Sequence, residues 1–448
     1  MTILATICEK VEATRFIDTH EHLIEEKQRL AGPPPNEWLF PCDDWAYLFM
    51  HYTRNDLNAA GMSLKDQEHF FSLTVDPEDK WPVFAPYWPR IQHTGYGQAV
   101  THSIRRLYGE EMIGSHNVAR ITEKMRKQVR KGYYREILQD ICGIESCQVN
   151  SLEPPTDKRW RGSQVFCVSE YPTLLYQDLS TVPMSTELDV PHLAAESGLP
   201  ARSLDDWYRI IDWYFERYGP RAVATKNQSA YVRRLDYEDV PKEVAAPLFA
   251  RHVQGDDGLT AGEMKALQDH LWRYCVRRAT EMNLPVKLHT GYYAGTNYMP
   301  LARVGQNLHD LCPILQDFPT TRFVLMHITY PYQDQLIALA KHYTNVYVDM
   351  CWAWIINPAA SVRFLKEYLM AAPSSKIFTF GGDYITVETV YGHSQIARPG
   401  IAQALSELVE EGWLTETDAL ALVEPLMCGN AREVFRLEEK RKILETAF

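Results

Sequence analysis

The sequence lacks the features that mark membrane, secreted disulfide-bonded or zinc-finger proteins. No uncharged apolar run approaches the roughly 18 residues of a membrane-spanning helix. The N-terminus, MTILATICEKVEATRF, has no basic segment followed by an apolar run of signal-peptide length. The nine cysteines are dispersed without a CxxC pair, which argues against a disulfide framework or a zinc finger. We therefore expect a cytoplasmic protein with free thiols and no membrane partner.

Basic charge is also scarce. Lysine and arginine number 46 against 58 acidic residues, and the formal net charge is −12. Nucleic acids and anionic membranes bind basic surfaces that release counterions, so we expect neither partner. The 448 residues, 46% of them hydrophobic, suffice for one large barrel with insertions or for two domains. We expect a small-molecule substrate and a homo-oligomer.

Short apolar, β-branched runs recur along the chain, and most are followed by a helix-like stretch. From the clearest to the least regular, they lie at 15–18, 322–326, 345–349, 376–380, 285–288, 144–149, 164–168 and 222–225. This alternation predicts βαβ units, and eight of them satisfy a closed (β/α)₈ barrel of the TIM type. An open doubly wound sheet is the alternative, but it usually carries a glycine-rich phosphate turn after its first strand. This chain has DTHEH there.

A long insertion separates the first two predicted strands. Residues 19–143 far exceed a usual βα connection, so this span must be a folded insertion. It begins with GPPPNEW and continues with segments such as 115–130, whose apolar residues have helical spacing. We expect a helical cap at 25–130 over the barrel mouth. The barrel itself would comprise 1–24 and 131–448, ending in closing helices.

Two histidines stand at the end of the first predicted strand. His20 and His22 are separated by one residue, so they point to the same side and can meet one metal ion. An isolated HxH pattern is a weak signal. Asp18 and Glu21 strengthen it, because carboxylates at this position could orient the imidazoles.

Three further candidate ligands follow later strands. His289 ends the run PVKL, His327 ends RFVLM, and Asp383 stands in FTFGGDY, where two glycines allow a sharp turn. Each alone could be a structural residue. Because strand ends meet at one mouth of a barrel, the set together predicts a metal-dependent active site.

The order of these residues resembles the amidohydrolase superfamily, whose pattern is HxH on strand one, histidine on strands five and six, and aspartate on strand eight. DTHEH, KLHTG, LMHIT and FGGDY match it, and the resemblance covers about residues 15 to 390. The chain is similar to the amidohydrolase-2 hydrolases and decarboxylases, including the domain fused to glutamine synthetase, and to uronate isomerases. The large insertion after strand one resembles both the isomerases and the fused-domain proteins.

The resemblance implies a divalent metal, with zinc favoured and manganese, iron or cobalt as alternatives. Its ligands would be His20, His22, His289 and Asp383. In a hydrolase, Asp383 would accept the proton of an activated water and His327 would polarise the carbonyl of an amide, lactone or ester. An isomerase, a decarboxylase and a non-catalytic binding scaffold remain the alternatives. The scaffold would be expected to have lost part of the ligand set.

Lys226 lies where binuclear members of the superfamily place a lysine that becomes a bridging carbamate. That reaction needs a neutral amine. The alternative, which we favour at this point, is a charged lysine that binds a substrate carboxylate as part of the catalytic machinery.

Other substrate contacts are expected from cationic and aromatic side chains, because a cation would match an anionic substrate. For the three larger aromatic residues among them, packing between cap and barrel is the alternative. The remaining histidines, including His51, are expected at the surface. The candidate substrate contacts are Arg90, His93, Tyr96, Trp352, Trp354 and Arg398.

Overall fold

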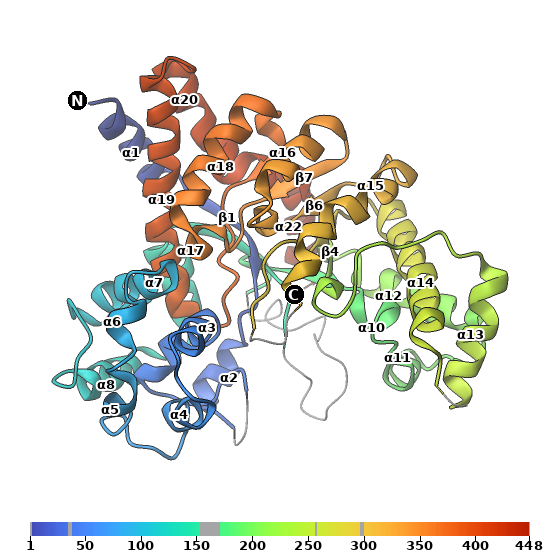
Figure 1. The fold of residues 1–448 in the computed structure, drawn as a ribbon, viewed down its shortest axis with the longest axis horizontal. Coiled ribbons are helices and arrows are strands. Elements are labelled where there is room, and N and C mark those ends of the chain that lie inside the picture. The colour runs from blue at the N-terminus through green and yellow to red at the C-terminus, as the bar shows by residue number, and fades with distance from the viewer. Residues whose placement is uncertain (1, 35–37, 153–170, 256–257, 296–299, 448) are drawn as a thin grey trace.

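Eight parallel β-strands follow one another in sequence order at the centre of the molecule (Figure 1). The computed structural model describes residues 2–34, 38–152, 171–255, 258–295 and 300–447. In these residues the strands are β1 Phe16–Glu21, β2 Ile144–Val149, β3 Leu175–Ser180, β4 Ala222–Asn227, β5 Val286–Leu288, β6 Phe323–Leu325, β7 Val346–Asp349 and β8 Ile377–Phe378.

The sheet closes because the chain after β8 runs beside β1. The Thr19 amide donates to the Phe380 carbonyl at 3.0 Å, and the Asp383 amide donates to the His20 carbonyl at 2.8 Å. Further along, the His22 amide donates to the Tyr384 carbonyl at 3.0 Å. The predicted (β/α)₈ barrel is therefore confirmed.

The third strand differs from the prediction. The predicted run 164–168 lies outside the described residues, and β3 has the sequence LYQDLS. Its polar residues Gln177 and Asp178 are buried. Asp178 is compensated by an ion pair with Lys287 at 2.7 Å. A strand whose inward residues are polar gives no apolar run, so the pattern in the sequence did not reveal it.

Helices surround the strands, and several begin at clear sequence signals. Capping boxes at Ser203, Thr260 and Thr415 start α12, α14 and α20. The barrel and closing helices are α1 Ile3–Ala13, α10 Val182–Ser185, α11 Val190–Ser197, α12 Leu204–Tyr218, α13 Lys242–Gln254, α14 Ala261–Glu281, α15 Asn307–Asp317, α16 Gln333–His342, α17 Ala353–Ile356, α18 Pro358–Ala371, α19 Val387–Glu410, α20 Glu416–Glu424, α21 Asn430–Val434 and α22 Leu437–Ala447.

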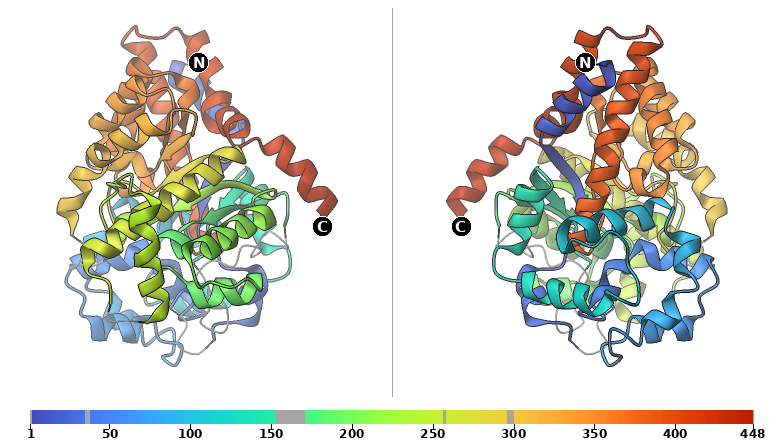
Figure 2. Two further views of the ribbon diagram at one scale, coloured as in Figure 1. Left: turned by 90° about the vertical axis from the view of Figure 1, so that its right-hand side faces the viewer. Right: turned by 90° about the vertical axis from the view of Figure 1, so that its left-hand side faces the viewer.

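The insertion between β1 and β2 is helical and has an aromatic core. Trp45, Phe49 and Phe70 all lie within 5.2 Å of Phe84, measured between ring centroids. Figure 2 shows these blue and teal helices gathered at one end of the barrel. They are α2 Glu26–Ala31, α3 Tyr52–Ala59, α4 Leu64–Phe70, α5 Trp81–Phe84, α6 Trp88–Ile91, α7 Gly95–Ser103, α8 Val118–Gln128 and α9 Tyr133–Arg135.

Two contacts fix this cap to α19. The buried Arg29 guanidinium forms an ion pair with Glu388 at 2.8 Å. Close helix packing provides the second contact, because a Cβ atom on Gly392 of α19 would lie 1.7 Å from the carbonyl oxygen of Ala99 in α7. The cap is thus attached to α19 through an ion pair and through close backbone packing.

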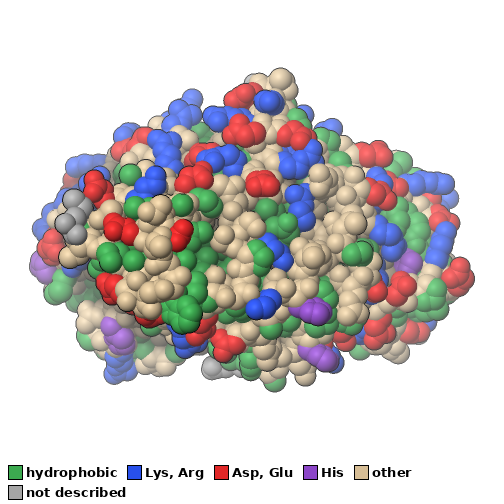
Figure 3. All heavy atoms as spheres, turned by 90° about the horizontal axis from the view of Figure 1, so that it is seen from above, with side chains coloured by type: hydrophobic (Ala, Val, Ile, Leu, Met, Phe, Trp, Pro, Cys, Tyr) green, Lys and Arg blue, Asp and Glu red, His purple; other side chains and the backbone are tan. Residues whose placement is uncertain are grey.

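The surface carries no obvious single-sign patch on the face shown in Figure 3, where basic and acidic side chains are interspersed. No described helix is both long enough and apolar enough to cross a membrane.

The close α7–α19 contact generates a test of the cap's attachment. We expect Gly392→Ala to destabilise the protein by about 1–3 kcal/mol, because the added methyl group must displace backbone. The thermal unfolding midpoint would fall accordingly. Gly262→Ala, on α14, is the matched control, since nothing lies within 4 Å of its Cβ position. A Gly392→Ala protein as stable as wild type would contradict this account of the packing.

Candidate metal and active site

Three side chains, two from the end of β1 and one from the turn after β8, meet at the mouth of the barrel. The Nε2 atoms of His20 and His22 lie 3.2 Å apart. Asp383 Oδ1 lies 3.2 Å from each of them, and all three residues are buried. These ligand atoms are close enough together to hold one metal ion. His289, which the sequence grouped with them, is not part of this cluster in the described residues.

The hydrogen bonds around His22 show that the cluster fits a cation. His22 Nδ1 lies 2.5 Å from the Asn150 carbonyl oxygen, which can only accept, so Nδ1 donates. Nε2 is then the nitrogen that faces Asp383 Oδ1, at 3.2 Å. Burial alone would raise the pKa of Asp383, but the neighbouring histidines hold it well below its ordinary value. A cation at this position would be bound by both imidazole nitrogens and by a carboxylate oxygen.

A second pair of histidines lies beside the first. His327 Nδ1 is 3.1 Å from the Cys351 carbonyl and His289 Nε2 is 3.0 Å from the Tyr292 carbonyl, so both of these nitrogens donate. The remaining nitrogens, His289 Nδ1 and His327 Nε2, face each other at 2.9 Å. Burial lowers the pKa of His327 to about 3, which keeps the ring neutral. Two lone pairs at this separation form a second position suited to a cation.

Lys226 stands close to both pairs. Its Nζ lies 3.0 Å from His20 Nε2, and its charge lowers the pKa values of His289 and His327. The side chain is buried, and burial lowers its pKa to about 8. Lys226 does not line the cavity above the site. Lys226 is therefore separated from the cavity wall, and its lowered pKa increases the fraction of neutral amine near pH 7.

Backbone strain is concentrated at these turns. Positive φ is unusual for residues other than glycine and often marks functional positions. Among the described residues nine non-glycine residues have positive φ, and six of them belong to the turns that carry or adjoin the candidate site. The six are His51, His327, Ile328, Thr329, Trp352 and Asp383.

A cavity of about 430 Å³ opens above the candidate ligands. His22, His289 and Asp383 form its floor, and the cap contributes Tyr52 and Arg54 to its wall. A larger hollow of about 1100 Å³ lies between α18 and α19, but it is lined by none of the strand-end ligands. The smaller cavity is therefore the candidate substrate site.

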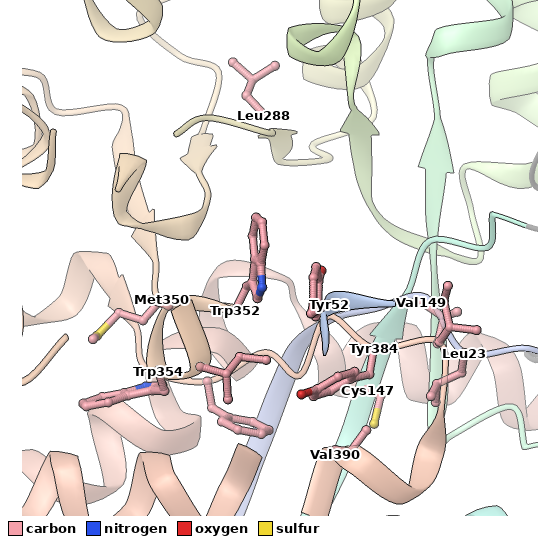
Figure 4. Close-up of a cluster of buried hydrophobic side chains, with 14 of the residues drawn as sticks. Leu23, Tyr52, Cys147, Val149, Leu288, Met350, Trp352, Trp354, Tyr384 and Val390 are labelled. Carbon is pink, nitrogen blue, oxygen red and sulfur yellow. The ribbon is translucent and has the colours of Figure 1, made fainter. Parts of the chain in front are cut away.

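His51 and Tyr52 are site residues that the sequence did not reveal. His51 was expected at the surface, but it lines the cavity and its ring centroid is 6.2 Å from that of His22. It stacks on Tyr52 at 3.9 Å, and Tyr52 stacks on Trp352 at 4.5 Å (Figure 4). The only sequence signal was a histidine–tyrosine pair inside the predicted cap. Spacing alone cannot show that these two residues contact the mouth of the barrel.

Two arginines predicted to bind substrate lie elsewhere. Arg90 is exposed and donates to the Ala60 carbonyl at 3.1 Å. Arg398 is buried and donates to three backbone carbonyls, those of Val11, Thr14 and Cys142. Its guanidinium joins α1 to the barrel, and Arg398 does not line the cavity.

The other four predicted contacts are divided between the site and its surroundings. His93 is exposed, and neither it nor Arg90 lines the cavity. Trp354 donates to the Thr379 carbonyl at 2.8 Å within the core. Tyr96 is buried behind Tyr52, with ring centroids 5.4 Å apart. Trp352 packs edge-on against His327 at 5.2 Å, which brings it directly to the candidate ligands.

Comparison with known proteins gives one family match. The amidohydrolase family model matches residues 231–437. The protein fluG of Emericella nidulans is 26% identical over 231 residues, which cover 49% of this chain and 26% of that protein. The chain thus matches about a quarter of the length of that relative.

Longer matches are to isomerases. The uronate isomerase of Corynebacterium efficiens is 20% identical over 417 residues, covering 86% of each chain. The crystal structure of glucuronate isomerase from Caulobacter crescentus superposes with a TM-score of 0.75 at 17% identity, covering 97% of this chain and 94% of that one. This likeness shows a shared fold. The family-model match over residues 231–437 confirms the resemblance to the amidohydrolase superfamily found in the sequence.

Proposed function

We propose that this protein is a metal-dependent hydrolase that cleaves an amide, lactone or ester bond of a small anionic molecule. The observation that carries the proposal is the second histidine pair. His289 Nδ1 and His327 Nε2 face each other at 2.9 Å beside Lys226, next to the His20, His22 and Asp383 cluster. Two adjacent cation positions suit the activation of water for hydrolysis.

The donor sets suggest which residues would hold each ion. His20, His22 and Asp383 would hold one, and His289 and His327 a second. Nitrogen and carboxylate donors of this kind suit zinc, and manganese, iron or cobalt also fit. When bound, such ions lower the pKa of water and polarise a carbonyl group.

Lys226 would join the two positions as a carbamate. Its neutral amine would attack carbon dioxide, forming an N–C bond and releasing one proton to solvent. The product would carry a negative charge and offer two oxygen ligands in place of a buried amine. The lowered pKa of Lys226, about 8, supports this step because it increases the neutral fraction near pH 7.

The remaining chemistry would fall to Asp383 and Tyr52. Asp383 would accept a proton from the attacking water and return it to the leaving group. Burial and the nearby Asp383 raise the pKa of Tyr52 well above its ordinary value, so its hydroxyl stays protonated. That hydroxyl could donate to the oxygen on which negative charge develops. The cap above would exclude bulk water from the reacting groups.

A sugar isomerase is the second candidate, and one observation favours it. Tyr52 and His51 of the cap line the same cavity as Asp383 and His289. Such a pair could move a proton between adjacent carbons. The relative in Corynebacterium efficiens is a uronate isomerase, and it covers most of the chain.

One parallel assay separates the two candidates. Zinc- and manganese-loaded protein would be incubated with N-acyl amino acids, small lactones and carboxylate esters, and separately with D-glucuronate and D-galacturonate. Hydrolysis of a member of the first set, with no ketose formed from the second, is the expected result. Ketose formation alone would replace the hydrolase proposal with the isomerase.

The metal content of the purified protein should correspond to two metal-binding positions per chain. We expect about two divalent ions per wild-type chain when the protein is purified without chelator. His22→Ala and His289→Ala should each lose an ion, measured by elemental analysis. His270→Gln is the control, because His270 is equally buried but binds Tyr208 and Val240 far from the site. A single ion that survives His289→Ala would contradict the second position.

Proton transfer at Asp383 is tested by Asp383→Asn. We expect kcat/KM to fall by at least about 10²-fold, because an amide cannot accept the proton of the attacking water. The circular dichroism spectrum and thermal midpoint should change little, and metal content would be measured beside activity. Retained turnover in a metal-loaded Asp383→Asn protein would remove its proposed role.

The binding of an anionic substrate should depend on Arg54. This half-buried residue of α3 lines the cavity, where its guanidinium could bind a carboxylate. Arg54→Met should raise KM by about 10–100-fold and leave kcat nearly unchanged, as expected for lost ground-state binding. Arg90→Met, on the exposed face of the cap, is the control and should behave as wild type. Equal KM values in both variants would exclude Arg54 as the carboxylate contact.

A further inference from the structure

A buried lysine lies in the barrel beneath the candidate ligands. Lys287 belongs to β5, two residues before His289, and its side chain is fully buried. Its ammonium group donates to the Thr19 carbonyl at 2.6 Å, to Asp178 Oδ2 at 2.7 Å and to Gln148 Oε1. These three acceptors belong to β1, β3 and β2. All three N–H bonds of the ammonium group are therefore used, and they join four strands.

The bond to Thr19 bears directly on the first candidate ligand, since Thr19 precedes His20. The Thr19 hydroxyl lies 2.8 Å from both Asp349 Oδ1 of β7 and the Phe380 carbonyl. Its amide donates to the same carbonyl at 3.0 Å. The end of β1 is thus fixed from three directions, and Lys287 provides the contact from β5.

The bond to Asp178 bears on the His20 ring itself. Asp178 Oδ2 lies 4.0 Å from His20 Nδ1, the nitrogen on the side away from the metal-binding cluster. The same oxygen forms the 2.7 Å ion pair with Lys287, whose positive charge balances the carboxylate. A carboxylate behind a metal-binding histidine favours the tautomer with a proton on Nδ1 and a free lone pair on Nε2.

Stability alone does not explain this ion pair. Moving two charged groups from water into the protein interior costs more free energy than burying two apolar side chains of similar size. Buried ion pairs can therefore often be replaced by hydrophobic residues without loss of stability. Asp178 of this pair instead contacts both Lys287, in the interior of the barrel, and the ring of His20. The other charged groups around Lys287 are Asp349 and Lys226, whose pKa values it lowers.

We infer that Lys287 is a positioning residue for the proposed metal centre: through Asp178 and the Thr19 carbonyl it fixes His20 so that Nε2 faces Asp383 and His22. The inference rests on the proposed metal-dependent function. It goes beyond that function by assigning a role to a residue that touches neither the ligand atoms nor the substrate cavity.

The test compares zinc affinity in folded variants, measured by competition with a chromophoric chelator. Lys287→Met should weaken zinc binding by about 10–100-fold, the range found when partners of metal ligands are removed. The visible absorption of the cobalt-loaded protein should also change, because the coordination geometry changes. Lys440→Met is the matched control. Lys440 is also buried, but the carbonyls to which it donates are those of Gly219 and Pro220 before β4, so its loss should lower thermal stability without changing zinc affinity.

A second variant allows for poor folding of Lys287→Met, in which Asp178 would be left as an unpaired buried charge. The double variant Asp178→Leu, Lys287→Met removes both charges and should fold, yet bind zinc as weakly as the single variant. Wild-type affinity in either folded variant would overturn the inference and leave the proposed function intact. An equal loss of affinity in Lys440→Met would also overturn it. A wild-type chain that binds no zinc or cobalt would overturn both proposals.

Discussion

The candidate site depends on how the barrel closes. A (β/α)₈ sheet has no edges only if its last strand pairs with its first, and here the hydrogen bonds of that seam run from residues 380–384 to β1. The same seam carries His20, His22 and Asp383. The bond from the Asp383 amide to the His20 carbonyl therefore both completes the barrel and sets the distance between two candidate ligands. The hydrogen bonds that close the barrel therefore also determine where the candidate ligands lie.

That constraint explains why so much irregular backbone gathers at the mouth. The seam requires Asp383 to turn with positive φ, and Gly381 and Gly382 precede it because side chains there would collide with Cys351 and Glu21. His327 and Trp352 adopt similarly unusual φ values at the ends of β6 and β7. Such conformations persist only within a rigid surround. The cap contributes to that surround through the stack of His51, Tyr52 and Trp352.

The sequence predicted the parts of this arrangement that follow from periodicity. Apolar runs located most of the strands, and the residues after them included the five histidine and aspartate residues of the candidate site. The prediction failed where a charged side chain lies in an environment that is unusual for its residue type. β3 has polar inward residues because Asp178 is neutralised by Lys287, a partner more than 100 positions away. Arg398 carries the charge expected of a substrate contact, but backbone carbonyls from two distant segments use it. A local sequence pattern cannot identify interaction partners that lie far away in the sequence.

The seam also has a consequence for synthesis on the ribosome. The carboxylate that completes the cluster of His20 and His22 belongs to Asp383, more than 360 positions further along the chain. Because proteins are made from the N-terminus, the histidine pair is synthesised long before its partner, and β1 lacks its neighbour at the seam until residues 380–384 follow. The complete cluster therefore cannot form on the nascent chain before the barrel can close. Closure of the barrel and assembly of the candidate cluster depend on the same segment.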